Sequence, residues 1–289
     1  MIKVHVNPIP ETLSQAMWRV ANALRAHAPD CVQIVNRVKD ADVEVLHVIG
    51  LDAIAYARAH PERRFVTIQY CYKTAGHPDP TWWMPLWEQS RMVWSYYDLP
   101  APRFYHSPLG IDAPFLENHP PVARDSAMTS GFVHGFGAEA IEEFTRASEA
   151  VGLRSLHLGP APLNMQYFPA GWKSVFGCDD RDLANHYRRS RFVSGLRWVE
   201  GFEMPVVEGL SCGAIPICFD RPEARRWFDG FALFVPETAD SDALTAAIAA
   251  EMAAHRYSSL SPERVAAARE RFSWATIAGG FWTRLLEAL

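Results

Sequence analysis

The sequence predicts an α/β protein made of two doubly wound parallel sheets that face each other across a cleft. Short β-branched runs alternate with helical patterns, and the alternation stops in a polar, proline-rich stretch and then resumes. With 49% apolar and 21% charged residues, the 289-residue chain is long enough for one large or two medium globular domains. Open α/β sheets bind ligands beyond the carboxyl ends of their strands, so the cleft is the expected site.

The first lobe is predicted from strands and helices that alternate near the start of the chain. The strand candidates are the runs IKVHV, VQIV, VEVLHVIG and RFVTIQY, and the helices are an amphipathic segment over residues 11–27 and a second one near 51–60. Residues 113–129 are rich in proline and polar side chains without any period, which predicts a linker between the lobes. The first lobe is therefore assigned to residues 1–117.

The same alternation resumes in residues 118–272, which are assigned to the second lobe. The predicted strands are SGFV, RSLHL, KSVFG, RFVSG, AIPICF and ALFVP. The predicted helices lie near residues 138–151, 180–189, 204–212, 240–254 and 261–271. This order predicts crossover helices on a second parallel sheet.

Charge and composition argue against several classes of protein. The net charge of −5, with basic and acidic residues mixed along the chain, gives no global footprint for nucleic acid or for an anionic membrane. No stretch approaches a membrane span, and the start MIKVHVNPIP lacks the pattern of a leader peptide. The five cysteines are odd in number and form no C-x-x-C pair, which favours free thiols in a reducing compartment. We expect a cytoplasmic protein.

The segment WVEGFEMPVVEGLSCGAIPICF (residues 198–219) predicts a loop, a helix and a strand. Pro205 suits the first turn of a helix, because its missing N–H would be unpaired there anyway, and Gly213 suits the left-handed position just past the end. The free N–H groups around residues 202–206 would point out of the helix start, where the macrodipole also favours negative charge. The helix start is therefore predicted to hold a diphosphate.

Two carboxylates, Glu200 and Glu208, stand eight positions apart in this segment, one on the loop and one in the helix. A carboxylate accepts hydrogen bonds from hydroxyl groups and is a poor partner for phosphate. Beside a diphosphate site, the pair is better placed to hold the hydroxyls of a sugar and of a ribose, and together these predict a nucleotide sugar. The alternative is that both are ordinary solvated acids beside a buried helix.

Beyond the two acids, the second lobe resembles the retaining GT-B glycosyltransferases that carry a Glu-x7-Glu motif, the glycosyl transferases of group 1 type. The resemblance is carried by EGFEMPVVE, by the CGAIPI that follows it, by the late FVP and, in the first lobe, by SPLGID. It implies two Rossmann-like lobes and a C-terminal helix, residues 273–289, that crosses back to the first lobe. The first lobe would hold the acceptor and the second the donor.

The resemblance also implies the reaction. A hexose would pass from a nucleotide diphosphate sugar, UDP- or GDP-linked, to a hydroxyl of a carbohydrate, a lipid-linked molecule or another acceptor, with retention of anomeric configuration. The acceptor would attack from the face of the departing group, and the donor phosphate would take its proton, so no protein base, cofactor or metal is required. The eleven histidines show neither H-x-x-x-H nor H-E-x-x-H.

The resemblance implies four catalytic candidates. Glu200 is the first acid of the motif, and Gln69 stands where many relatives have a histidine. The family's Arg and Lys after the first strand of the second lobe are missing from SGFVHGFGAEA, so Arg197 and His134 are the nearest replacements to stabilise the leaving diphosphate. Arg197 is the first choice, because a guanidinium grips two phosphate oxygens at once.

The donor is expected to contact further residues of the second lobe. These are Gly201, Phe202, Glu203, Met204, Glu208, Lys173 and Gly177. Lys173 is a third candidate cation, and in the alternative reading it is solvated while Arg197 pairs with an acid. Glu203 stands where the family favours a small residue, so its side chain must turn away from the donor or contact it. The family's Gly-Gly pair is also missing from NPIPETLSQ, after the first strand.

An aromatic concentration between residues 70 and 105 is a candidate acceptor site, because aromatic faces stack on sugars and bases. The candidates within it and beside it are Tyr72, His77 and Trp82. Other members are expected to pack the core of the first lobe, as the helical spacing of two of them suggests. Those expected in the core are Trp83, Trp87 and Trp94.

Two other functions fit part of the sequence. A GT-B relative that has lost its phosphate cations would only bind a sugar nucleotide, which the missing Arg and Lys favour and the intact pair of glutamates disfavours. A GT-B glucosyltransferase acting on hydroxymethylated bases of DNA would use the aromatic residues to hold a flipped base, which the acidic net charge disfavours.

Overall fold

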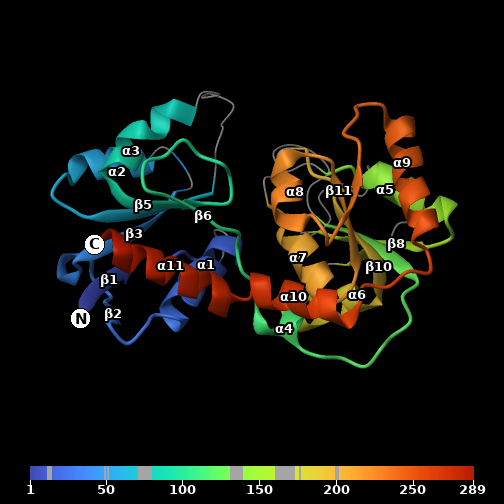
Figure 1. Ribbon diagram of the computed structural model, residues 1–289, viewed down its shortest axis with the longest axis horizontal. Coiled ribbons are helices and arrows are strands. Elements are labelled where there is room, and N and C mark those ends of the chain that lie inside the picture. The colour runs from blue at the N-terminus through green and yellow to red at the C-terminus, as the bar shows by residue number, and fades with distance from the viewer. Residues whose placement is uncertain are drawn as a thin grey trace. The chain divides into compact units, whose positions relative to one another are not determined.

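The computed structural model describes residues 1–11, 15–48, 50, 52–70, 80–130, 139–159, 173–175, 177–198 and 202–289 (Figure 1). For Gln15, Pro80 and residues 173–175 the description covers the backbone alone. The chain divides into two compact units, of which unit 1 is Met1–Gly110 together with Phe272–Leu289, and unit 2 is Ile111–Arg271.

Unit 1 is built on a six-stranded parallel sheet in the order β2-β1-β3-β4-β5-β6. The strands are β1 (Ile2–Val6), β2 (Val32–Ile34), β3 (Val43–Val48), β4 (Phe65–Gln69), β5 (Ser90–Ser95) and β6 (Phe104–His106). The helices are α1 (Gln15–Ala26), α2 (Asp52–Ala59), α3 (Met84–Gln89) and α11 (Trp274–Ala288), with short 3-10 turns η1 (Val38–Asp40) and η2 (Pro80–Trp83). Helices α1 and α11 cover one face of the sheet and α2 and α3 the other, so the sheet is doubly wound (Figure 1).

The core of unit 1 contains the aromatic side chains that the sequence assigned to it. Trp83, Trp87 and Trp94 are fully buried, which confirms this part of the prediction. Strand β4 is buried along its whole length, as expected for a central parallel strand with helices on both faces.

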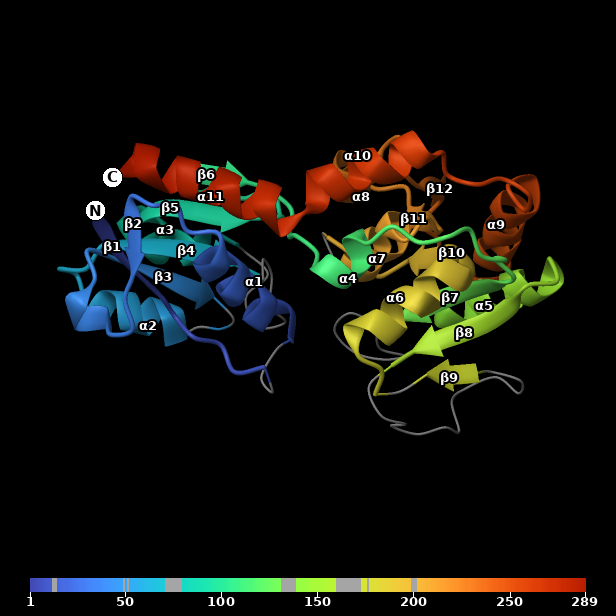
Figure 2. The same ribbon diagram turned by 90° about the horizontal axis from the view of Figure 1, so that it is seen from below.

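Helix α11 belongs to unit 1 although it follows unit 2 in the sequence (Figure 2). It begins after Ser273, whose hydroxyl accepts a hydrogen bond from the N–H of Thr276 and so caps the helix. The indole N–H of Trp282 donates to the carbonyl oxygen of Leu24 over 3.1 Å, and the ring of Phe281 lies 5.4 Å from that of Trp94. These contacts attach the predicted terminal helix to the sheet of the first unit.

Unit 2 is built on a second six-stranded parallel sheet in the order β12-β11-β10-β7-β8-β9. Its strands are β7 (Ser126–Ser130), β8 (Arg154–Leu158), β9 (Lys173–Val175), β10 (Ser190–Gly195), β11 (Ile215–Phe219) and β12 (Leu233–Val235). Its helices are α4 (Ala113–Leu116), α5 (Ile141–Ala150), α6 (Asp180–Arg189), α7 (Met204–Ser211), α8 (Pro222–Phe228), α9 (Ser241–Ala254) and α10 (Pro262–Phe272). Helices α5 and α9 pack together, and α4 packs on α6 and α7.

The predicted linker over residues 113–129 is wrong in part. It contains the short helix α4 and β7, the first strand along the chain of the second sheet. Strand β7 begins at Ser126, four residues before the predicted strand SGFV. Phe115 of α4 is fully buried, with its ring 6.2 Å from that of Tyr187 on α6, so this segment already belongs to the second core. The boundary between the units therefore lies between Gly110 and Ile111, seven residues before the predicted one.

Among the described residues, no helix is both long and apolar enough to cross a membrane. The cysteines in the described part of the chain, Cys31, Cys178, Cys212 and Cys218, are free thiols. Cys71 lies outside the described residues.

Candidate functional site

The candidate site is the carboxyl edge of the second sheet, where β7 and β10 end beside the start of α7. Gly209 of α7 allows this helix to lie close to the sheet, because a Cβ at that position would lie 2.7 Å from Cγ1 of Val193 in β10. Pro205 lies in the first turn of α7, and Gly213 follows its end with a φ of +85°, both as predicted. The predicted helix is therefore present, and the prediction that its start holds an anion rests on the general chemistry of helix starts.

Glu208 lies within α7 and is buried, with only 4% of its surface exposed. Its Oε2 accepts a hydrogen bond from the hydroxyl of Tyr187, on α6, over 3.2 Å. Burial and then the charge of Glu208 raise the pKa of Tyr187 well above its usual value, so this phenol remains a hydrogen-bond donor. The alternative interpretation predicted an ordinary solvated acid at this position, and it is wrong for Glu208 because this carboxylate is buried.

Arg197 and Glu203, two of the predicted site residues, form an ion pair after the end of β10. Nε of Arg197 lies 3.0 Å from Oε2 of Glu203, and both side chains are largely buried. The guanidinium also donates to the carbonyl oxygen of Ser130, the last residue of β7, over 3.3 Å. The glutamate that replaces a small residue of the family is therefore directed at the guanidinium that we proposed for the diphosphate.

Glu139 is a third charged residue of this cluster, and the sequence analysis did not identify it. It is buried, its Oε2 accepts a hydrogen bond from the N–H of Ser130 over 3.2 Å, and its backbone pairs with that of Arg197. Burial raises its pKa to about 7, although the charge of Arg197 and hydrogen bonds from Ser194 and Ser130 act in the opposite direction. The signal in the sequence is a single acid inside the small, uncharged run GFGAEAI before an amphipathic helix.

The remaining donor candidates of unit 2 take different positions. Phe202 is buried, with its ring 5.7 Å from that of Phe228, so its side chain packs in the core while its backbone leads into α7. Met204 opens α7 and is half-buried. Gly177 is exposed with a φ of +62°, before the N-cap Asp179 of α6. Lys173 begins β9, where only its backbone is described.

Two predicted site residues lie in the described part of unit 1. Gln69, at the end of β4, is fully buried, and its side-chain oxygen accepts a hydrogen bond from the indole N–H of Trp87 over 3.3 Å. Trp82 lies in η2 with its ring 4.6 Å from that of Trp83. Gln69 is therefore held within the core of unit 1, and Trp82 is half-buried at its margin.

Five predicted site residues lie outside the described residues. They are Glu200, Gly201, His134, Tyr72 and His77. Within the part of the chain that is described, no three His, Cys, Asp or Glu side chains are grouped so that they would hold a metal ion.

Two doubly wound parallel sheets, with the final helix returned to the first of them, form the GT-B fold. HepE from Anabaena, in complex with UDP, matches the chain with a TM-score of 0.73 at 12% identity over 100% of both chains. Sucrose-phosphate synthase from Thermosynechococcus elongatus matches with a TM-score of 0.69 at 12% identity over 99% of both chains. A trehalose-6-phosphate synthase studied for glycosyl transfer with retention matches with a TM-score of 0.63 at 11% identity, again over 99% of both chains.

These structures are GT-B glycosyltransferases, and at this level of identity they establish the fold of the chain. No protein-family model matches the sequence, and no curated protein matches it significantly. The function is therefore inferred from the site.

Proposed function

We propose that this protein is a glycosyltransferase that moves a hexose from a nucleotide diphosphate sugar to an acceptor hydroxyl, with retention of configuration. The observation that carries the proposal is the buried carboxylate of Glu208 inside α7, a helix that begins beside the carboxyl edge of a GT-B sheet, where helix starts favour a diphosphate. Burying a carboxylate costs free energy, which a purely structural position would avoid with an apolar residue. Among the similar structures, HepE was solved with UDP and with UDP and glucose.

In this proposal each acid of the motif holds hydroxyl groups of a UDP- or GDP-linked donor. Glu208 accepts hydrogen bonds from the ribose, and Glu200 accepts them from the transferred sugar. The hydroxyl of Tyr187 donates to Oε2 of Glu208 and so helps to fix the orientation of this carboxylate. The N–H groups at the start of α7 approach the diphosphate.

The reaction develops negative charge on the departing diphosphate, so groups that stabilise this charge supply much of the catalysis. Arg197 is the cation proposed for this role, with His134 and Lys173 as further candidates. The acceptor hydroxyl attacks from the face of the leaving group and passes its proton to the donor phosphate, so the protein supplies no base. Unit 1 is proposed to hold the acceptor through Tyr72, His77 and Trp82.

Glu208→Gln is expected to weaken binding of the donor roughly ten- to a hundredfold, because a hydrogen bond to a charged acceptor contributes ~1.5–3 kcal/mol. Glutamine keeps an oxygen that accepts from Tyr187, so the helix contact survives the change. The measurement is calorimetric titration with UDP- and GDP-sugars, and Glu200→Gln is tested in parallel. Glu149→Gln, on the exposed surface of α5, is the matched control. Unchanged affinity in both motif variants would refute the assignment.

Transfer is expected to continue in the presence of EDTA, because the helix start and a cationic side chain neutralise the diphosphate in this proposal. The assay follows sugar transfer from the donor with EDTA and after addition of magnesium or manganese, and NMR of the product gives its anomeric configuration. Activity that EDTA abolishes and a divalent metal restores would overturn the metal-free mechanism, and an inverted product would overturn retention.

A second function is favoured by one observation. Arg197 is paired with Glu203, so its charge is already compensated before any donor is bound. A protein that binds a sugar nucleotide without transferring the sugar would tolerate this pairing. Donor binding without hydrolysis or transfer across a panel of acceptors, hydroxymethylated DNA among them, would select this function over the enzyme.

A further inference from the structure

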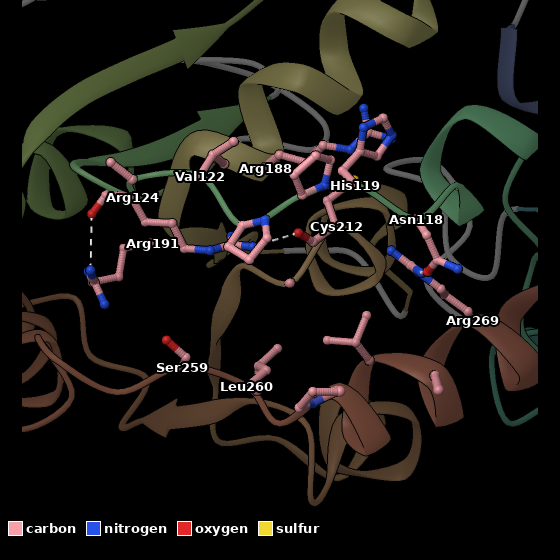
Figure 3. A pocket seen from close by; sticks show the side chains of 17 residues that line it. Asn118, His119, Val122, Arg124, Arg188, Arg191, Cys212, Ser259, Leu260 and Arg269 are labelled. Atoms are coloured by element: carbon pink, nitrogen blue, oxygen red, sulfur yellow. Dashed lines mark hydrogen bonds between the residues drawn. The ribbon is translucent and has the colours of Figure 1, made fainter.

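A pocket of about 540 Å³ lies in unit 2 at the edge of the sheet opposite to the candidate site (Figure 3). Arg124 precedes β7, Arg191 lies at the start of β10, and Gly213 precedes β11, so the pocket opens beside the amino ends of these strands. The candidate site lies at the carboxyl ends. Strands of five or six residues separate the two places by roughly 15 Å. This pocket is therefore a separate cavity.

Four arginines line the pocket: Arg124, Arg188, Arg191 and Arg269. Arg124 donates to the carbonyl oxygens of Ser190 and Cys212 over 2.9 and 2.8 Å. Arg269 donates to the carbonyl oxygen of Ser211 over 2.8 Å. The bonds to Ser211 and Cys212 hold carbonyl groups at the end of α7, where a cation also interacts favourably with the helix dipole, and the bond to Ser190 holds the end of α6.

The other two arginines also donate to carbonyl or amide oxygens, and Arg188 does so to the carbonyl oxygen of Pro114 over 2.6 Å and to Oδ1 of Asn185 over 2.9 Å. Arg191 donates to the carbonyl oxygens of Ser258 and Arg124 over 2.9 and 3.1 Å, in a partly exposed position (Figure 3). Arg188 is only 5% exposed, and its Nε–H is buried without a hydrogen-bond partner among the described residues. A buried, unsatisfied donor on a charged group costs free energy that a bound acceptor would recover.

The charge of this cluster is not compensated. In the described part of the chain the four arginines donate to carbonyl and amide oxygens, and none of them forms an ion pair with a carboxylate. Among the described residues that line the pocket, His119 lies close to an acid, with its Nε2 3.5 Å from Oε2 of Glu117. Burial lowers the pKa values of Arg124 and Arg269; Cys212 acts in the opposite direction, and a neighbouring guanidinium, of Arg191 and of Arg188 respectively, adds to the lowering. Four close cations without an anion predict a missing anionic partner.

We propose that this pocket binds a small molecule that carries phosphoryl groups. The planar fork of an arginine matches two oxygens of a phosphoryl group, and a cluster of four suits a ligand with two or more negative charges. Pro121, Val122 and Leu260 provide an apolar wall for the remainder of the ligand. The volume lies within the range of pockets that hold small ligands. This site does not depend on the proposed donor site.

The test is calorimetric titration of the whole protein with inorganic pyrophosphate at low ionic strength. Binding is expected for the wild type, and Arg191→Gln is expected to weaken it roughly tenfold or more because a charge-assisted fork is removed. Arg191 is partly exposed, so this variant is expected to fold, which a melting curve verifies. Arg191→Lys restores the charge without the fork and is expected to recover only part of the affinity. Arg225→Gln, at an exposed position on α8 paired with Asp220, is the control with the same loss of charge.

Binding of pyrophosphate at the donor site is distinguished by Arg197→Gln, which would weaken that binding alone, whereas Arg191→Gln is expected to weaken pyrophosphate binding and to leave the affinity for the sugar nucleotide unchanged. The proposal is overturned if pyrophosphate does not bind, if Arg191→Gln and Arg225→Gln weaken it equally, or if only Arg197→Gln weakens it. The last measurement is a calorimetric titration with citrate, an anion that has no phosphoryl group. Equal affinity for citrate would show that the pocket selects charge rather than a phosphoryl group.

Discussion

Arg197→Gln is expected to lower kcat about a hundredfold while the KM for the donor changes less. The guanidinium lies after the end of β10, near the start of α7 where the diphosphate is proposed to bind. A group that acts mainly on charge developing in the transition state affects turnover more than binding of the ground state. The measurement is kcat and KM with a productive donor and acceptor pair, with Lys173→Gln and His134→Gln for comparison.

The control for this variant addresses stability, because Arg197 lies between the buried carboxylates of Glu203 and Glu139. Removal of one partner of a buried ion pair costs about 3–5 kcal/mol, so turnover must be divided by the folded fraction. Glu203→Gln releases the guanidinium without removing it and is expected to retain turnover. Near wild-type turnover per folded molecule in Arg197→Gln would refute a role of this arginine in catalysis.

Glu139→Gln is expected to be more stable than the wild type at pH 8, by on the order of 3 kcal/mol, and by only about 1 kcal/mol at pH 5. The folded protein keeps the proton of Glu139 up to a pKa of about 7, whereas the unfolded chain releases it near 4.5. The folded state therefore binds more protons between these values, and the wild type loses stability as the pH rises through this window. Glutamine resembles the protonated acid at every pH.

Urea unfolding of both proteins between pH 5 and pH 8 tests this expectation. The difference in free energy of unfolding isolates Glu139, because other titrating groups contribute equally to both proteins. Glu149→Gln, exposed on α5, is expected to give a difference that does not change with pH. A pH-independent difference for Glu139→Gln would mean that this carboxyl group titrates in its ordinary range.

The fold was predictable where hydrophobic periodicity is strong. The runs that became β1, β3, β4, β10 and β11 are β-branched and buried, and the helices α5, α6, α7, α9 and α10 lie where their patterns placed them. Strand β7 was missed because SAMTS contains only one large apolar side chain, Met128, and no β-branched aliphatic residue, yet the whole strand is buried. Its assignment depends on tertiary packing, which a local pattern does not contain.

The candidate site was predictable in part. Glu208, Pro205 and Gly213 follow from helix chemistry, and the structure places all three as that chemistry requires. The pairing of Arg197 with Glu203 depends on where two loops meet, and the position of Glu139 depends on a contact between segments more than fifty residues apart in sequence. Such contacts are set by the register of the sheet and are invisible in a linear pattern.

The return of α11 to unit 1 has a consequence for folding of the protein during its synthesis on the ribosome. Residues 1–110 are made before unit 2, but the helix that covers β5 and donates a hydrogen bond to Leu24 is made after it. Unit 2 is continuous and can complete its own core earlier. At ~5–20 residues per second, the face of the first sheet waits roughly ten to thirty seconds for Phe281 and Trp282. During that interval Trp94 lacks part of its cover, and this face is the part of the nascent chain most open to chaperones and to aggregation.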